Sequence, residues 1–151
     1  MLSKSSMTLP AQAETLLKNA VLAPSSHSTQ PWRFNVSGDL ISLYADRTRA
    51  LPVNDPEDRE LTISCGCALM NLRVAAAETG LGTNTRIFPN EDHDLLAAVE
   101  LDKSPDAGNE EEAQLFPAIA QRRTYRKRFE SGQVPESIPP KLSDQANREG
   151  A

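Results

Sequence analysis

The segment that most constrains the fold is a long helix, predicted over about residues 56–80. Asp55 and Pro56 suit an N-cap and a first helical position, and the acidic residues after them favour the positive end of the helix dipole. Gly80 followed by Leu81 is typical of a helix that stops at a glycine with a hydrophobic contact. An apolar stripe runs through Leu61, Cys65, Ala68, Leu69, Leu72 and Ala76.

The remaining sides of this helix carry small residues, at Gly66, Cys67, Ala75 and Ala77. Other backbones can therefore pack close on more than one side, and we expect the helix to be central.

Strands are predicted before and after this helix in the sequence. Apolar and polar residues alternate over 32–36, and with 37–39 as a turn and 40–45 as the return strand they predict a β-hairpin. Another strand is predicted over 83–88, whereas 95–101 suits either a strand or a short helix.

Two further helices are predicted. One starts at Pro10 and stops before Pro24, because the residue preceding a proline is disfavoured in the α region. The other covers 114–126 and is interrupted early by Pro117. Both ends of the chain are polar: 1–9 are expected to be disordered, and 130–151 form a Pro-rich polar tail with too little apolar content to pack on its own.

The composition of the 151 residues fits one domain and excludes several classes of protein. A net charge of −5 argues against a general nucleic-acid binder. No run approaches the ~18 apolar residues of a membrane span, and the first residues lead into no secretory signal. Two cysteines make no disulfide framework, which favours a reducing compartment. We expect a cytoplasmic chain with no nucleic-acid or membrane partner.

One stretch is strongly basic in an otherwise acidic chain: Arg122, Arg123, Arg126, Lys127 and Arg128, with Thr124 among them. Arginine binds phosphate in a bidentate manner, and a threonine hydroxyl adds a neutral donor. On a helix, Arg122 and Arg126 would share a face and could reach one dianion. Solvation of a helix end is an equal alternative. Nucleic-acid binding is a third, with aromatic residues limited to Tyr125 and Phe129.

Residues 23–32 combine four hydroxyl side chains, an amide and an imidazole between Pro24 and Pro31. Such a loop can offer hydrogen bonds to a polar ring edge or a ribityl chain. A serine hydrolase is not indicated, because there is no Gly-x-Ser-x-Gly turn and no third member to orient His27. Taken alone, the segment favours a connection rich in capping residues, with Trp32 as a core anchor.

Cys65 and Cys67 are separated by one glycine, and closely spaced cysteines can indicate metal or redox chemistry. Neither His27 nor His93 has ligand spacing to them, so we predict no metal site and interpret the cysteines as small packing residues.

Together these segments resemble the FMN-dependent nitroreductase superfamily, most closely its Acg-like branch. The resemblance runs from about Leu16 to Phe129 and rests on Ala23-Pro24-Ser25-Ser26-His27-Ser28-Thr29-Gln30-Pro31-Trp32-Arg33-Phe34, on Asp46-Arg47-Thr48-Arg49-Ala50-Leu51, on Asp55-Pro56-Glu57-Asp58-Arg59-Glu60-Leu61 and on Arg122-Arg123-Thr124-Tyr125-Arg126. It implies an α+β fold, with helices around a mixed or antiparallel sheet, and residues 10–129 as a nitroreductase-like half domain.

The resemblance also implies a cofactor site for FMN between two such units. The phosphate and ribityl chain would be held by Arg122, Arg123, Thr124 and Arg126. The flavin would be contacted from the partner unit by Pro24, Ser25, Ser26 and Ser28. The implied partners are NAD(P)H, a small nitroaromatic or quinone acceptor, and either a second copy of the chain or a second nitroreductase-like half. No catalytic residue is assigned, because the redox chemistry belongs to the cofactor.

Two features depart from the family pattern. Ser28 stands where the family usually has asparagine, which removes an amide donor and acceptor. The arginine segment follows the Pro-Ser-Ser segment, whereas single-unit nitroreductases have the opposite order. The order found here resembles the Acg-like branch, in which two halves share one chain, so we expect the N-terminal half with the second half missing.

Three functions follow as hypotheses. The first is an FMN-dependent oxidoreductase that reduces nitroaromatic or quinone-like acceptors with NAD(P)H by a ping-pong mechanism. The second is a flavin-binding or sequestering protein without turnover. The third is a cofactor-free interaction module whose basic segment docks an acidic partner.

Overall fold

The fold is built on a four-stranded sheet in which all neighbouring strands are antiparallel. A computed structural model describes residues 9–104 and 106–150. The strands lie in the order β1 (Trp32–Ser37), β2 (Leu40–Ala45), β4 (Leu95–Asp102) and β3 (Gly82–Ile87). The predicted hairpin is confirmed, with Trp32 opposite Ala45 and Ser37 opposite Leu40. The α+β class is confirmed, and the sheet is antiparallel.

The helices are α1 (Leu9–Ala20), α2 (Arg59–Glu78), α3 (Glu110–Ala113), α4 (Phe116–Gln121) and α5 (Ile138–Arg148), with 3₁₀ turns at Ser26–Ser28 and Arg47–Arg49. The disorder predicted for the N-terminus falls, for residues 1–8, outside the described residues.

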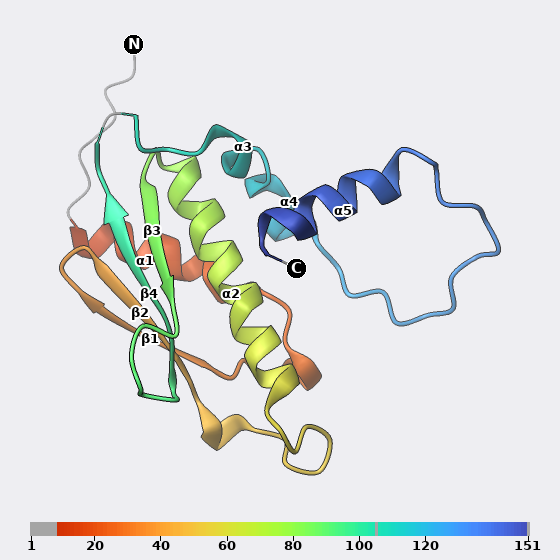
Figure 1. The fold of residues 1–151 in the computed structure, drawn as a ribbon, viewed down its shortest axis with the longest axis horizontal. Helices are drawn as coiled ribbons and strands as arrows, with labels where there is room; N and C mark the ends of the chain where they lie inside the picture. Colours follow the sequence, from red (N-terminus) through yellow and green to blue (C-terminus); the bar gives the residue numbers. More distant parts are fainter. Residues whose placement is uncertain (1–8, 105, 151) are drawn as a thin grey trace.

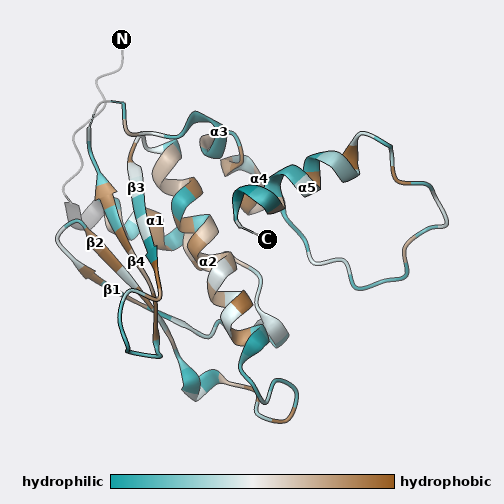
Figure 2. Cartoon of the chain, in the orientation of Figure 1, coloured by the Kyte–Doolittle hydropathy of each residue, from teal (hydrophilic) through white to brown (hydrophobic). Residues whose placement is uncertain are grey.

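Helix α2 is central, as predicted. It contacts all four strands and also α1, α3 and α4. Figure 1 shows it lying along one face of the sheet, and Figure 2 shows apolar residues concentrated in the sheet and in α2. Leu16, Ile41, Leu43, Leu72 and Val99 are fully buried between these elements. The helix ends as predicted: Gly80 has φ 78°, and the Leu81 N–H donates to the Ala76 carbonyl at 3.0 Å.

The predicted start of α2 at Pro56 is wrong by three residues. Asp58 has φ 53°, in the left-handed region, so the helix begins only at Arg59. Asp55 still caps the helix, from outside it, because its buried carboxylate accepts the Leu61 N–H at 2.9 Å. Burial raises the pKa of Asp55, but the N–H groups of the first helical residues outweigh this effect and hold the pKa below its usual value.

The choice between strand and helix for 95–101 is decided in favour of a strand. Residues 95–99 of β4 are all buried, so both faces of the strand are covered there and its side chains do not alternate between core and solvent. A continuous apolar run of this length cannot be distinguished from a buried helix by periodicity.

The helix predicted over 114–126 is mostly wrong. Pro117 lies in the first turn of α4 and begins the helix there, where a missing N–H costs nothing. The helix ends at Gln121, and Arg122 is extended with ψ 135°. The segment 122–137 contains no helix or strand. We call it the arm; in Figure 1 it runs away from the body and returns through α5, none of whose residues is buried.

Candidate functional site

The loop between α1 and β1 has an unusual backbone. His27, Ser28 and Gln30 all have positive φ, of 49°, 58° and 50°, although none is glycine. Such conformations are rare for residues with a side chain and persist only where the surrounding structure holds them. Here the Ser25 hydroxyl accepts the Gln30 N–H at 2.9 Å, and the Thr29 hydroxyl donates to the Ser26 carbonyl at 3.0 Å. The loop therefore has a fixed shape.

The same loop is tied to the first turns of α2. The Ser26 N–H donates to the Ser64 hydroxyl at 3.2 Å, and the Ser26 hydroxyl donates to Glu60. Further along, the Cys65 thiol donates to the Pro31 carbonyl at 3.2 Å. These contacts set Ser25 and Ser26 at the side of α2.

A hollow of about 240 Å³ lies at this junction, lined by Pro24, Ser25, Ser26, Glu60, Ile63, Ser64 and Cys67. Three of the four predicted flavin-contacting residues therefore line one hollow. Ser28 does not line it, and its neighbour His27 lies beside Asn54, with 3.2 Å between the ring Nε2 and the amide nitrogen.

The first predicted phosphate ligand comes close to this loop. One Arg122 guanidinium nitrogen donates to the Leu22 carbonyl at 3.4 Å, and another donates to the Thr124 hydroxyl at 3.1 Å. Burial raises the pKa of the Cys67 thiol, while the positive charge of Arg122 acts to lower it. The structure thus brings Arg122 and Thr124 next to the end of α1 and the Pro24–Ser26 loop, across almost a hundred residues of sequence.

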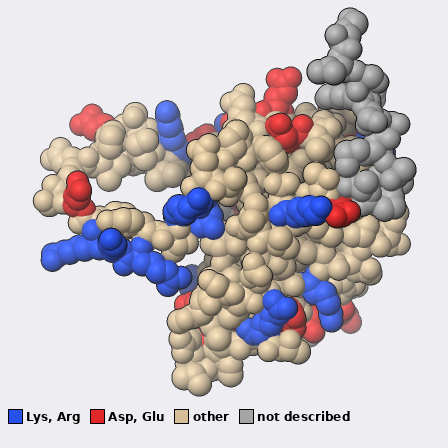
Figure 3. Space-filling model, turned by 180° about the vertical axis from the view of Figure 1, so that it is seen from behind, with Lys and Arg blue, Asp and Glu red and all other residues tan. Residues whose placement is uncertain are grey.

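The other basic residues are not gathered onto one face. Because 122–126 is not helical, the shared face predicted for Arg122 and Arg126 is wrong. Arg123 turns back to the carbonyls of Ala120 and Arg122, both at 2.8 Å. Arg126, Lys127 and Arg128 are exposed, and no ion pair is found for them within the described chain. Figure 3 shows cationic side chains along the arm as it stands off the body.

Sequence reasoning missed Glu60, Ile63, Ser64 and Cys67 as residues of the hollow. From the sequence alone, Glu60 is one of the acidic residues that favour the positive end of the helix dipole, and Cys67 is a small packing residue. A signal was present, because Glu60, Ser64 and Cys67 lie four and three residues apart and share one face of the predicted helix.

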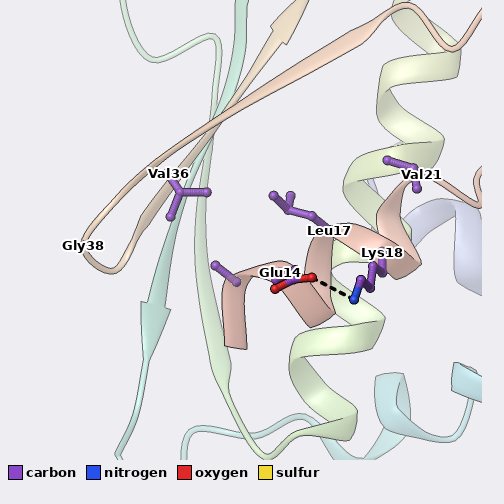
Figure 4. A pocket seen from close by; sticks show the side chains of 7 residues that line it. Glu14, Leu17, Lys18, Val21, Val36 and Gly38 are labelled. Atoms are coloured by element: carbon purple, nitrogen blue, oxygen red, sulfur yellow. Dashed lines mark ion pairs between the residues drawn. The ribbon is translucent and has the colours of Figure 1, made fainter. Parts of the chain in front are cut away.

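A larger groove, of about 630 Å³, lies between α1 and the β1–β2 hairpin (Figure 4). Its walls are mainly aliphatic, with Leu17, Val21 and Val36. The charged residues among its described lining are Glu14 and Lys18, which form an exposed ion pair at 2.8 Å. None of the predicted site residues lines this groove, so it is not the candidate site.

Relatives of known sequence share most of the chain. A Mycobacterium tuberculosis protein provisionally named as the NAD(P)H nitroreductase acg is 38% identical over 111 residues, which cover 73% of this chain and 33% of that protein. A second M. tuberculosis protein, also provisionally named as an NAD(P)H nitroreductase, is 37% identical over 122 residues, 80% of this chain and 35% of the relative. No protein-family model matches the chain.

Solved structures share its fold. The nitroreductase CinD of Lactococcus lactis, in complex with nicotinic acid, aligns with a TM-score of 0.57 at 13% identity, covering 87% of this chain and 93% of that one. The chain is therefore similar in sequence to proteins named as NAD(P)H nitroreductases and similar in fold to solved nitroreductases. A Desulfovibrio desulfuricans protein provisionally named as a nitroreductase, in complex with FMN, aligns with a TM-score of 0.56 at 16% identity, covering 71% and 80%.

The chain spans about a third of the length of the two M. tuberculosis relatives. Over residues 9–104 and 106–150 it contains no group of three or more potential metal ligands. Within the same residues, no helix has both the length and the apolar character needed to cross a bilayer.

Proposed function

We propose that the chain is an FMN-binding unit of a nitroreductase-type oxidoreductase. The observation that supports this most directly is the approach of Arg122 to the Pro24–Ser26 loop, because it places a cation beside a pre-shaped hollow. When bound, FMN would supply the redox chemistry of a ping-pong sequence in which electrons pass from NAD(P)H to a nitroaromatic or quinone acceptor.

The residues present fit a flavin nucleotide in two respects. Arg126, with its neighbours Lys127 and Arg128, is exposed and forms no ion pair within the described chain, so these cations remain available for a phosphate. The hollow combines a mainly apolar surface, which includes Ile63, with the hydroxyl-bearing Ser25 and Ser26, a combination that suits a ring with a polar edge.

Each proposed residue then has a task. Arg122, Arg123, Thr124 and Arg126 bind the phosphate and ribityl chain, and Pro24, Ser25 and Ser26 contact the ring. Ser28 lies outside the hollow and has no ring contact there. The Ser26–Glu60 hydrogen bond and the Ser64 contact hold the loop so that its shape does not have to form on binding.

A single unit does not enclose the cofactor. The hollow of about 240 Å³ is smaller than the roughly 300–1,000 Å³ typical of pockets that bury such ligands. We therefore propose that a second unit, either a second copy or a second nitroreductase-like half, completes the site in a cytoplasmic oxidoreductase.

FMN titration followed by flavin fluorescence tests the assignment. Each charge-assisted hydrogen bond contributes about 1.5 kcal/mol or more, so Arg122→Ala with Arg126→Ala should weaken FMN binding on the order of 100-fold. Arg86→Ala is the matched control, because Arg86 is an exposed arginine of β3 outside the site. Equal FMN affinity in the double variant and the control would refute the phosphate assignment. FMN-dependent oxidation of NAD(P)H with a quinone acceptor separates turnover from binding alone.

A further inference from the structure

Helix α5 is attached to the body by charge rather than by burial. None of its residues is buried, and Leu142 on it is 66% exposed. No other helix or strand of the described chain packs along it. A hollow of about 160 Å³ remains between α2, α3 and α5, so the interface is not filled by side chains.

The attachment consists of ion pairs at the C-terminal end of α5. Arg73 on α2 donates to Glu149 at 3.0 and 3.2 Å and also to Glu112. Arg148 donates to Glu111 of α3. The Glu149 and Arg148 side chains are 55% and 49% exposed, so water and salt reach both pairs that hold α5. The arm that leads to α5 contains no regular structure that would fix it from the other side.

The same two residues form a wall of a cavity. A cavity of about 510 Å³ that is partly open to solvent lies between α2 and the edge strand β3, lined by Thr83 and Thr85 on the strand and by Arg148 and Glu149 at the end of α5. When α5 leaves, this wall is removed, and solutes have freer access to Arg73, Thr83 and Thr85, which are half-buried while α5 is docked.

We infer that α5 is a strap that covers the cavity beside β3 only while the Arg73–Glu149 and Arg148–Glu111 pairs hold. Exposed pairs of this kind each shift an equilibrium by roughly 1.4- to 5-fold. The two together shift the ratio of docked to undocked strap by roughly 2- to 25-fold, and screening by salt reduces that shift. The strap is therefore a conformational device that responds to ionic strength, independent of the proposed flavin site.

Two readouts on the full chain test the strap. An isolated helix of eleven residues is marginal in water, so the undocked α5 should lose protection of its backbone amides in hydrogen exchange. Access to the cavity is measured with Thr83→Cys. Iodoacetamide modifies the cysteine introduced at this position, and the rate is followed in the peptide that contains residue 83.

The perturbation is Arg148→Gln with Glu149→Gln, which changes α5 alone and leaves the net charge unchanged. The matched control is Glu136→Gln with Lys141→Gln, which is also neutral overall and alters two residues without ion pairs in the described chain. Arg148→Gln with Glu149→Gln should raise the rate of amide exchange in α5 and the rate of modification at residue 83 by roughly 2- to 25-fold. Adding 0.5 M NaCl to the chain with the unaltered α5 should have the same effect. The control substitutions should change neither rate. Unchanged amide exchange over 138–148 would overturn the strap. Faster exchange with unchanged modification of residue 83 would overturn its role as a cover.

Discussion

Gly82 is the position where a single methyl group tests the packing of the fold most sharply. It is buried at the start of β3, and a Cβ placed there would lie 2.6 Å from the Ala107 carbonyl oxygen and 2.8 Å from the Ala107 Cβ. Both distances are shorter than any ordinary contact, and one of the atoms belongs to the backbone. In Gly82→Ala, the loop around Ala107 must therefore move away from β3.

The magnitude follows from two opposing effects. Overpacking of this kind costs about 1–3 kcal/mol, whereas replacing glycine by alanine gains about 0.4–1 kcal/mol by restricting the unfolded chain. With mid-range values of about 2 and 0.7 kcal/mol, the net loss is about 1.3 kcal/mol, which corresponds to roughly 3–5 °C in Tm for a chain of this size.

Gly66→Ala is the matched control, since it makes the same chemical change in the opposite setting. Gly66 lies on an exposed side of α2, and a Cβ there has nothing within 4 Å. Alanine should therefore stabilise the helix by about 0.5–1 kcal/mol. Thermal unfolding and urea unfolding, both followed by circular dichroism, measure the two variants. If Gly82→Ala is as stable as the unchanged chain, or if both substitutions shift Tm in the same direction, the packing argument is refuted.

Two further predictions concern titrating groups. Because folding lowers the pKa of Asp55, its contribution to stability is fully present above the unfolded value of about 3.9 and is lost as pH falls through the lower folded pKa. The stability gap between the unchanged chain and Asp55→Asn in urea unfolding should therefore close at acidic pH, and a gap of constant size would contradict the capping role. Burial, with a smaller effect from Cys67, raises the pKa of Cys65 to about 12, so iodoacetamide at pH 8 should modify Cys67 well before Cys65. Mass spectrometry of the two sites checks the order, and faster modification of Cys65 would show that the burial is misassigned.

The sequence was most informative where one local signal had one structural outcome. The 37–39 turn between alternating strands predicted the β1–β2 hairpin, and Gly80 with Leu81 predicted the end of α2. It was less informative where tertiary contacts chose between outcomes. Burial of β4 on both sides removed the alternation that identifies a strand, and the left-handed backbone at Asp58 delayed α2 past an apparently good N-cap.

The candidate site shows the same limit. The residue types of the Pro-Ser-Ser loop and the arginine segment indicated an anion and ring site, and the resemblance joined them. Arg122 reaches the loop by donating a hydrogen bond to the Leu22 carbonyl. This contact depends on how α4 packs on α2, and no local sequence pattern encodes that packing. The helical face expected for Arg122 and Arg126 is not formed, because α4 ends at Gln121.

The strand order has a consequence for how the chain can assemble during synthesis. Among the described strands β4 comes last in the sequence, yet it lies between β2 and β3 and pairs with both. The β1–β2 hairpin needs only local contacts and can form early, whereas β3 has no partner strand until β4 arrives. A nascent chain that ends before residue 95 therefore lacks the strand with which both β2 and β3 pair. Closure of the sheet, and with it full burial of Val99 against the core, is a late event that waits for the C-terminal end of β4.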